Sequence, residues 1–319
     1  MKNKCFYCYK EIDSVELGTE AGSKGYHEKC SKKFFGKIHP PELNFTEDEI
    51  FELAEAVIKS QKTVTGVQPK LSLGLSENTV EPERFAIVGL WGEYILKPQT
   101  KIYASLPEIE DLTMHLAEIS KLKTVEHSLI RLKSGELAYL TKRIDRENGG
   151  KLHMEDMCQI TERMTEHKYN GSYEQIAKAI KKYTANPGLS VTDFFELVMF
   201  CFLTGNNDMH LKNFSLLKEN SQYDLCPAYD LVASELVVEG DDEDLALNLN
   251  GKKKKIKKRD FIEAMEGAGL DRKVIENIFK KYNQLIPKWA EFIEKSFLNA
   301  VLKEEYKSLL LRKSEQIEL

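Results

Sequence analysis

The chain has 319 residues, a formal net charge of −5, 42% hydrophobic residues and 30% charged residues. This length allows one large or two ordinary domains with a sizeable core, and the charge gives no indication of nucleic-acid binding. The opening residues lack the apolar run of a signal peptide and no stretch is long enough to span a membrane, so we expect a cytoplasmic protein. Six cysteines, three of them in apolar contexts, favour free thiols in a reducing compartment.

The N-terminal segment, residues 1–38, carries a Cys/His pattern. Cys5-x2-Cys8 is followed after eighteen residues by His27-x2-Cys30. Two ligands, a loop and two more ligands are typical of a tetrahedral zinc site, and four protein ligands would make it structural rather than catalytic. The alternative is three free thiols and a surface histidine. A region this short has little core of its own, so a metal would help it to fold.

After a linker that begins at His39, the chain is expected to be rich in strands. Thr46 and Glu49 match a capping box at the start of a helix that runs to about residue 60. The pattern then predicts a strand, a turn and a strand over residues 63–75. Two hairpins follow, one of strands 84–88 and 93–96, the other of strands 125–132 and 136–142. An amphipathic helix is expected between them, over residues 106–121.

Beyond residue 146 the pattern becomes mostly helical. Helices are predicted over residues 154–164, 173–183 and 191–204, the last ending at Gly205-Asn206-Asn207. Residues 245–250 alternate like a strand, and Asp260 is expected to cap the first of several further helices. A small sheet-rich half (residues 39–146) followed by a larger helical half (residues 147–319) predicts an α+β fold.

The segment 251–259 is the only strongly basic run, with six lysines and an arginine. It could indicate nucleic-acid binding. We favour an exposed loop whose charge is offset by the acidic residues 239–244, and therefore expect no direct nucleic-acid partner.

A polar loop after the helix predicted over residues 191–204 carries the clearest functional pattern. It sets Asp208 and Asn213 five positions apart, and Asp230 follows a short predicted strand. Protein kinases use one carboxylate to receive the proton of the attacking hydroxyl, and an Asn and a second Asp to hold the metal ions on the ATP phosphates. The alternative is an ordinary loop whose Asp and Asn side chains bond to the backbone.

Two charged residues and a glycine loop precede this pattern. Lys97 ends an apolar strand, where its ammonium needs a partner, and Glu110 lies on the following helix. In a kinase such a lysine reaches the nucleotide phosphates and pairs with such a glutamate; the alternative is an edge-strand lysine and a solvated glutamate. Gly66 permits close backbone approach and Lys70 offers a phosphate contact, although a plain hairpin is the alternative there. The order of these parts along the chain is that of a kinase.

With these pieces together, the chain resembles the HipA family of serine/threonine kinases, the toxin kinases of bacterial toxin–antitoxin systems. The resemblance spans about residues 63–258 and implies a protein-kinase-like two-lobe fold with a sheet-rich N-lobe and a helical C-lobe. The N-terminal subdomain of full-length relatives has no match, and the Cys/His segment stands in its place. The matching motifs are Gly66–Lys70, Ile95–Pro98, Leu106–Glu110, Arg143–Arg146, Glu155–Gln159, Gly205–Ser215 and Pro227–Asp230.

The resemblance implies a role for each matched residue. Asp208 would be the catalytic base, and Asn213 and Asp230 would bind Mg²⁺. Lys97 would contact the phosphates of ATP, with Glu110 as its anchor. Thr63 stands where the family carries a Ser that is autophosphorylated, and Thr65 offers a second acceptor. The remaining residues expected to line the nucleotide site are Gly66, Val67, Lys70, Arg143, Ile144, Asp145, His210 and Tyr229.

The implied function is an ATP- and Mg²⁺-dependent serine/threonine kinase that acts as a toxin on a translation-related protein, such as an aminoacyl-tRNA synthetase. A helix-turn-helix antitoxin and a small protein that replaces the N-terminal subdomain are the expected partners. One alternative is a secreted or translocated effector kinase that acts on host proteins. The other is a pseudokinase that signals by docking.

Overall fold

The computed structural model describes residues 3–60, 70–75, 84–88, 92–147, 149–238, 240 and 242–319. Two compact units are present, and one of the points where the chain passes from one to the other falls inside helix α5 (Leu106–Ile119). The domain boundaries predicted after residues 38 and 146 stay predictions. The first unit comprises Met1–Asp111, Val125–Arg143 and Lys295–Phe297; the second comprises Leu112–Thr124, Ile144–Glu294 and Leu298–Leu319.

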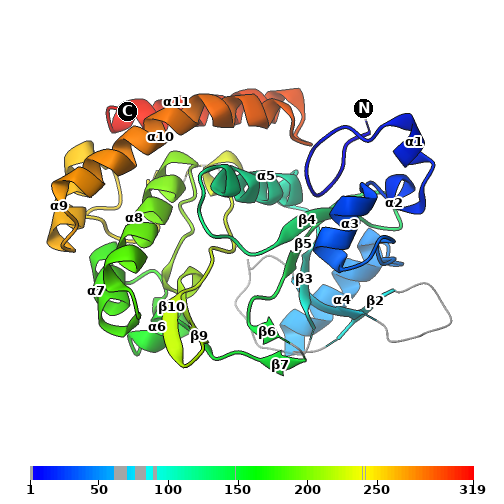
Figure 1. Ribbon diagram of the computed structural model, residues 1–319, viewed down its shortest axis with the longest axis horizontal. Coiled ribbons are helices and arrows are strands. Elements are labelled where there is room, and N and C mark those ends of the chain that lie inside the picture. The colour runs from blue at the N-terminus through cyan, green and yellow to red at the C-terminus, as the bar shows by residue number, and fades with distance from the viewer. Residues whose placement is uncertain are drawn as a thin grey trace. The chain divides into compact units, whose positions relative to one another are not determined.

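The first unit contains a five-stranded antiparallel sheet in the order β2-β1-β3-β5-β4. Figure 1 labels β2, β3, β4 and β5 of this sheet. The predicted hairpin of β4 and β5 is confirmed. The predicted hairpin of β2 and β3 is wrong, because β1 lies between them and Leu73 pairs with both Ile87 and Tyr94. The strands are β1 Leu71–Leu75, β2 Phe85–Ile87, β3 Tyr94–Lys97, β4 His127–Arg131 and β5 Leu137–Lys142.

The N-terminal segment shares one hydrophobic core with this sheet. Phe34 lies edge to face against Tyr94 with ring centroids 6.0 Å apart, and Phe35 lies against Phe85 at 6.1 Å. The predicted capping box is confirmed, since the Thr46 N–H donates to Glu49 at 2.7 Å. The helices of this region are α1 Ser14–Leu17, α2 Glu20–Ser23, α3 Glu28–Phe35 and α4 Glu47–Ser60.

The second unit is mainly helical, and α10 and α11 lie side by side in it (Figure 1). Its helices are α6 Met157–Ile160, α7 Tyr173–Tyr183, α8 Pro187–Leu203, α9 Lys258–Gly267, α10 Arg272–Glu294 and α11 Ala300–Gln316, with short 3-10 turns η1 Thr165–His167, η2 Leu211–Asn213 and η3 Ser234–Leu236. Its strands are β6 Arg146–Glu147, β7 Gly150–Lys151, β8 Met154–Asp156, β9 Ser215–Glu219 and β10 Gln222–Leu225.

Four expectations for this unit are corrected. Residues 154–164 are not one helix, because β8 pairs with β9 and Asp156 then caps the short helix α6. Residues 245–250 are not a strand, since only Asn248 and Leu249 among them form isolated bridges. Asp260 is the third residue of α9 rather than its cap, and its carboxylate accepts the N–H of Lys257, the capping residue, at 2.9 Å. Helix α8 also begins at Pro187, earlier than predicted, with proline in its first turn where the missing N–H costs nothing.

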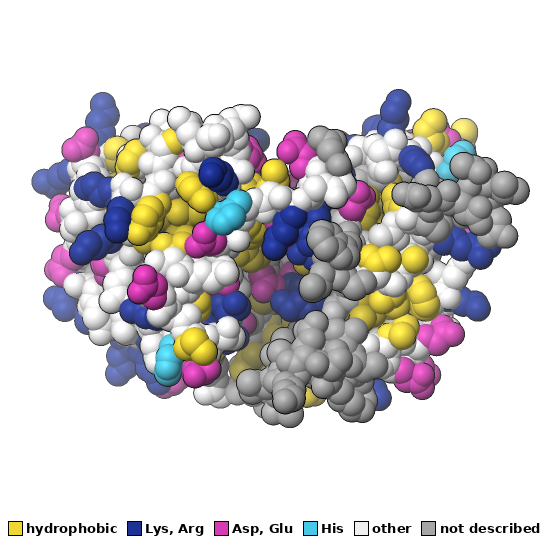
Figure 2. Space-filling view, turned by 90° about the horizontal axis from the view of Figure 1, so that it is seen from below, with side chains coloured by type: hydrophobic (Ala, Val, Ile, Leu, Met, Phe, Trp, Pro, Cys, Tyr) yellow, Lys and Arg dark blue, Asp and Glu magenta, His cyan; other side chains and the backbone are white. Residues whose placement is uncertain are grey.

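Charges of both signs are interspersed on the face shown in Figure 2. The basic run is offset by its neighbours as predicted: Lys253 pairs with Glu243 at 3.6 Å, and Lys254 pairs with Asp242. Within the described ranges, no helix combines the length and the apolar composition that crossing a membrane requires.

Candidate functional site

The polar loop starts directly after helix α8, and the packing of that helix determines where the loop begins. Ten of the last eleven apolar positions of this helix pack inward, so its C-terminal end is anchored in the core. The Thr204 hydroxyl donates back to the Phe200 carbonyl at 2.9 Å, and Gly205 follows with φ +66°. A Cβ atom at Gly205 would lie 2.7 Å from Leu309 Cδ2, so this turn requires glycine for both its backbone angle and its space.

Gly205→Ala is therefore expected to lower the free energy of unfolding by about 1–3 kcal/mol, since it combines a strained φ with a steric clash. The measurement is the midpoint of urea denaturation. Gly188→Ala is the matched control, because Gly188 lies in the first turn of α8 with no atom within 4 Å of its added Cβ. That control should be neutral or stabilising by up to about 1 kcal/mol, and equal losses in both variants would contradict the argument.

Two buried asparagines shape the loop after this turn. The Asp208 N–H donates to Asn206 Oδ1 at 3.3 Å, and the Asn207 N–H donates to Ser234 Oγ at 3.0 Å. Asn206 is completely buried and Asn207 nearly so, whereas Asp208 is partly exposed. The Asn206 amide and the Ser234 hydroxyl thus satisfy these two backbone N–H groups inside the protein, while the Asp208 carboxylate keeps access to solvent.

Asn213 closes the loop back onto Asp208. Its Nδ2 donates to the Asp208 carbonyl at 3.2 Å, and the His210 N–H donates to the same carbonyl at 2.8 Å. This orientation makes Oδ1 the atom that Asn213 can offer to a metal ion. Amide and carboxylate oxygens are the protein ligands that Mg²⁺ takes, so the chemistry of Asn213 and of the half-buried Asp230 fits this ion.

Tyr169 contacts the Asp208 carboxylate, which the sequence did not predict. Its hydroxyl donates to Asp208 Oδ1 at 2.5 Å from a position 39 residues upstream. The same ring lies edge to face on His210 with centroids 5.0 Å apart. No motif marks Tyr169, because the contact depends on how the turn after η1 packs against the loop.

The buried imidazole of His210 is influenced by the charges of two aspartates. Burial lowers the pKa of His210 below its ordinary value, while the charges of Asp208 and Asp230 oppose that shift. Both carboxylates therefore act on the same imidazole. Asp230 itself has φ +61°, in the left-handed region that Asp tolerates better than most residues.

Tyr229 holds the Asp230 segment against the loop. Its hydroxyl donates to the Lys212 carbonyl at 3.0 Å and lies 2.6 Å from Ser215 Oγ. Burial raises the pKa of the Tyr229 phenol well above its ordinary value, so the hydroxyl stays protonated and can donate. Tyr229 thus has a structural function whichever ligand the site binds.

The segment 154–159 lies against the same loop. Lys212 Nζ pairs with Asp156 Oδ2 at 2.8 Å, and the Met157 N–H donates to the Phe214 carbonyl at 2.9 Å. Asp156 also accepts the Gln159 N–H in a capping box at the start of α6. The motifs Glu155–Gln159 and Gly205–Ser215, which are far apart in the sequence, are therefore in contact in one polar region of the second unit.

Lys97 and Glu110 form a buried ion pair in the first unit. Lys97 Nζ lies 2.5 Å from Glu110 Oε1, and the two residues are only 4% and 1% exposed. The ammonium also lies 5.5 Å from the centroid of the Tyr139 ring. Removing two charges from water costs free energy, so a buried ion pair does not by itself indicate a gain in stability. A buried pair of this kind is consistent with a functional site.

The other predicted nucleotide-site residues keep their assigned roles as predictions. Lys70 is exposed directly before β1, and Arg143 and Ile144 are half-buried directly after β5. The Asp145 carboxylate is buried and pairs with Arg146 Nη1 at 2.5 Å. Thr63, Thr65, Gly66 and Val67 lie outside the described residues.

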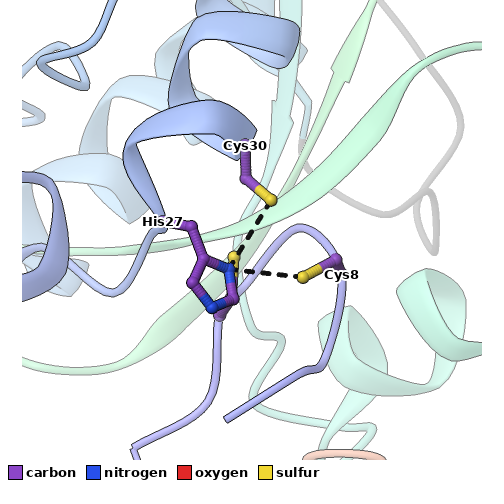
Figure 3. Close-up of side chains that lie close together, drawn as sticks. Cys8, His27 and Cys30 are labelled. Atoms are coloured by element: carbon purple, nitrogen blue, oxygen red, sulfur yellow. Dashed lines mark hydrogen bonds between the residues drawn. The ribbon is translucent and has the colours of Figure 1, made fainter. Parts of the chain in front are cut away.

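The predicted metal-ligand set of the N-terminal segment is brought together. One ligand atom from each of Cys5, Cys8, His27 and Cys30 lies within 4.8 Å of every other. Figure 3 shows Cys8, His27 and Cys30 of this set. All three thiols are free. This cluster lies in the first unit.

Proteins similar to this chain carry kinase names. The chain is 29% identical over 305 residues to a Haemophilus influenzae protein named "Putative kinase", covering 86% of this chain and 85% of that one. It is 26% identical over 251 residues to the serine/threonine-protein kinase toxin HipA of Shewanella oneidensis, covering 72% of this chain and 56% of the relative.

A solved structure of Shewanella oneidensis HipA, in complex with HipB and operator DNA, matches with a TM-score of 0.68 at 24% identity, over 83% of this chain and 71% of that one. This likeness confirms the predicted α+β, kinase-like fold. A family model described as the HipA-like C-terminal domain matches residues 63–290, which is more than half of the chain, and the chain accordingly belongs to that family.

Proposed function

We propose that this chain is an ATP- and Mg²⁺-dependent protein kinase that phosphorylates serine or threonine hydroxyls. The observation that carries the proposal is the loop of the second unit. The side chains of Asn206 and Asn213 bond to the backbone of the partly exposed Asp208. Tyr229 bonds the segment of Asp230 to the same loop. The kinase names of its relatives support the same function. The buried Lys97–Glu110 pair supplies the cation that a kinase needs for the nucleotide phosphates.

In the proposed reaction, the Asp208 carboxylate orients the acceptor hydroxyl and takes its proton. The hydroxyl oxygen bonds to the γ-phosphorus of ATP as the bond to the β–γ bridging oxygen breaks, and ADP leaves. Lys97 donates to the α- and β-phosphates, with Glu110 holding its ammonium in place. Mg²⁺ bound by Asn213 and Asp230 would neutralise the charge on the phosphates. Arg143, Ile144 and Asp145 would contact the adenosine.

The test is incubation of the purified chain with γ-labelled ATP, with and without Mg²⁺, and with serine, threonine and tyrosine peptides as acceptors. We expect label on serine or threonine that is lost when Mg²⁺ is omitted. Mapping the labelled sites of the chain itself tests Thr63 and Thr65. ATP binding without any transfer would instead favour the docking pseudokinase.

We further propose that the chain acts in the cytoplasm as a toxin on a translation-related protein, with a helix-turn-helix antitoxin as partner. The relatives that support this role are the HipA toxin and the HipA complex with HipB and DNA. Controlled expression in bacterial cells is expected to arrest growth, and co-expression of a helix-turn-helix protein encoded next to it should relieve the arrest. Phosphate transfer without arrest, together with labelling of host proteins, would favour the effector alternative.

Tyr169→Phe should strengthen the binding of acceptor peptides. The Tyr169 hydroxyl donates to the Asp208 carboxylate, the group that we propose orients the acceptor hydroxyl, so the two donors are expected to compete for it. A hydrogen bond of ordinary net strength corresponds to a fall of about 2- to 10-fold in KM for the peptide, with kcat little changed. The matched control is Tyr183→Phe, because that tyrosine is 45% exposed on α7. A rise in KM would show that Tyr169 positions Asp208 instead.

A further inference from the structure

The Cys/His cluster has the dimensions of a zinc site. Zinc bonds of about 2.3 Å to sulfur and about 2.0–2.1 Å to nitrogen, at a tetrahedral angle, place sulfur and nitrogen about 3.6 Å apart. The Cys8 and Cys30 sulfurs lie 3.5 Å and 3.6 Å from His27 Nδ1 (Figure 3). The fourth ligand atom, the Cys5 sulfur, lies within 4.8 Å of the other three.

The groups around the cluster favour metal ligands. His27 Nε2 lies 3.2 Å from the Glu11 carbonyl and 3.5 Å from a Glu16 carboxylate oxygen, so the proton belongs on Nε2 and the lone pair on Nδ1.

Tyrosines next to two of the cluster residues bond to helix α5 and strand β4 of the same unit. Tyr9, next to Cys8, is 3% exposed and donates to Asp111 Oδ2 at 2.7 Å. Tyr26, next to His27, is 1% exposed and donates to the Leu129 carbonyl of β4 at 2.5 Å. Asp111 directly follows Glu110 on α5, and its other oxygen lies 2.7 Å from His127 Nδ1.

We propose that Cys5, Cys8, His27 and Cys30 bind one structural zinc ion, and that the filled site holds Tyr9 on Asp111 and so keeps Glu110 in place for Lys97. The metal site stands on the geometry of the cluster alone. Its effect on catalysis rests on the proposed kinase function. Four protein ligands leave no open position, so the zinc has no part in the chemistry.

The first experiment measures zinc in the purified full chain by mass spectrometry after dialysis. We expect one zinc ion per chain in the wild type and loss of zinc in Cys8→Ser. Cys158→Ser is the matched control and should keep its zinc, because it removes a buried thiol outside the cluster. Cobalt-loaded wild type should show thiolate-to-metal absorption, which keeps the test valid if Cys8→Ser does not fold. Wild type without zinc, and without that absorption when cobalt is added, would overturn the site.

The second experiment tests the coupling through Tyr9. Tyr9→Phe keeps the ring and all four ligands, so zinc should stay bound while the rate of phosphate transfer falls by about 2- to 30-fold. Tyr183→Phe should change neither quantity. An unchanged rate in Tyr9→Phe would overturn the coupling and leave the metal site standing. Wild type that binds zinc and transfers no phosphate would instead overturn the kinase proposal.

Discussion

Asp208→Asn is expected to reduce phosphate transfer by about 10²- to 10⁴-fold, the usual contribution of a positioned general base. The substitution preserves the shape of the side chain, and its amide oxygen can still accept from the Tyr169 hydroxyl. The contacts that close the loop use the main-chain carbonyl of residue 208, which the substitution does not change. What is lost is the ability to take the proton of the acceptor hydroxyl.

The measurement is single-turnover transfer of labelled phosphate to a peptide, with ATP affinity and the denaturation midpoint determined in parallel. ATP affinity and stability should change little, because the backbone of the loop keeps its hydrogen bonds. Asp224→Asn is the matched control, since it makes the same chemical change at an exposed position of β10 in the same unit. If both variants transfer phosphate as fast as wild type, Asp208 is not the base.

The local part of the candidate site could be predicted from the sequence. Asp208 and Asn213 are only five positions apart in the sequence. The segment that contains them follows the buried helix α8 through Gly205, so few backbone conformations are open to it. The same reasoning applies to the capping box at Thr46 and to the hairpin of β4 and β5. In each case the residues that determine the structure are near neighbours in the chain.

The errors and omissions concern partners that are distant in the sequence. Residues 84–88 and 93–96 suggested a hairpin because they are adjacent, but both strands pair with β1, which comes earlier in the chain. Residues 154–164 have a helix-like apolar pattern, yet pairing with β9 makes the first three a strand. Tyr169 was missed for the same reason, because only packing brings it to Asp208. Local pattern does not determine such long-range contacts.

Lys97→Met is expected to lower the free energy of unfolding by about 3–5 kcal/mol, because it removes the cation that neutralises a nearly completely buried carboxylate. The double variant Lys97→Met with Glu110→Leu should regain most of that stability, since apolar side chains of similar volume replace both charges. Phosphate transfer should stay low in the single and the double variant alike, because neither has an ammonium for the phosphates.

This double-mutant cycle separates a structural function of the pair from a catalytic one. Urea denaturation gives the stability, and transfer of labelled phosphate gives the activity. Arg272→Met is the control for an exposed pair, since Arg272 and Glu276 are 87% and 65% exposed and their pairing should contribute less than about 1 kcal/mol. Recovery of both stability and activity in the double variant would show that the pair only holds α5 against β3. Recovery of stability alone would indicate that the chain retains a buried, costly ion pair because the phosphates of its nucleotide need Lys97.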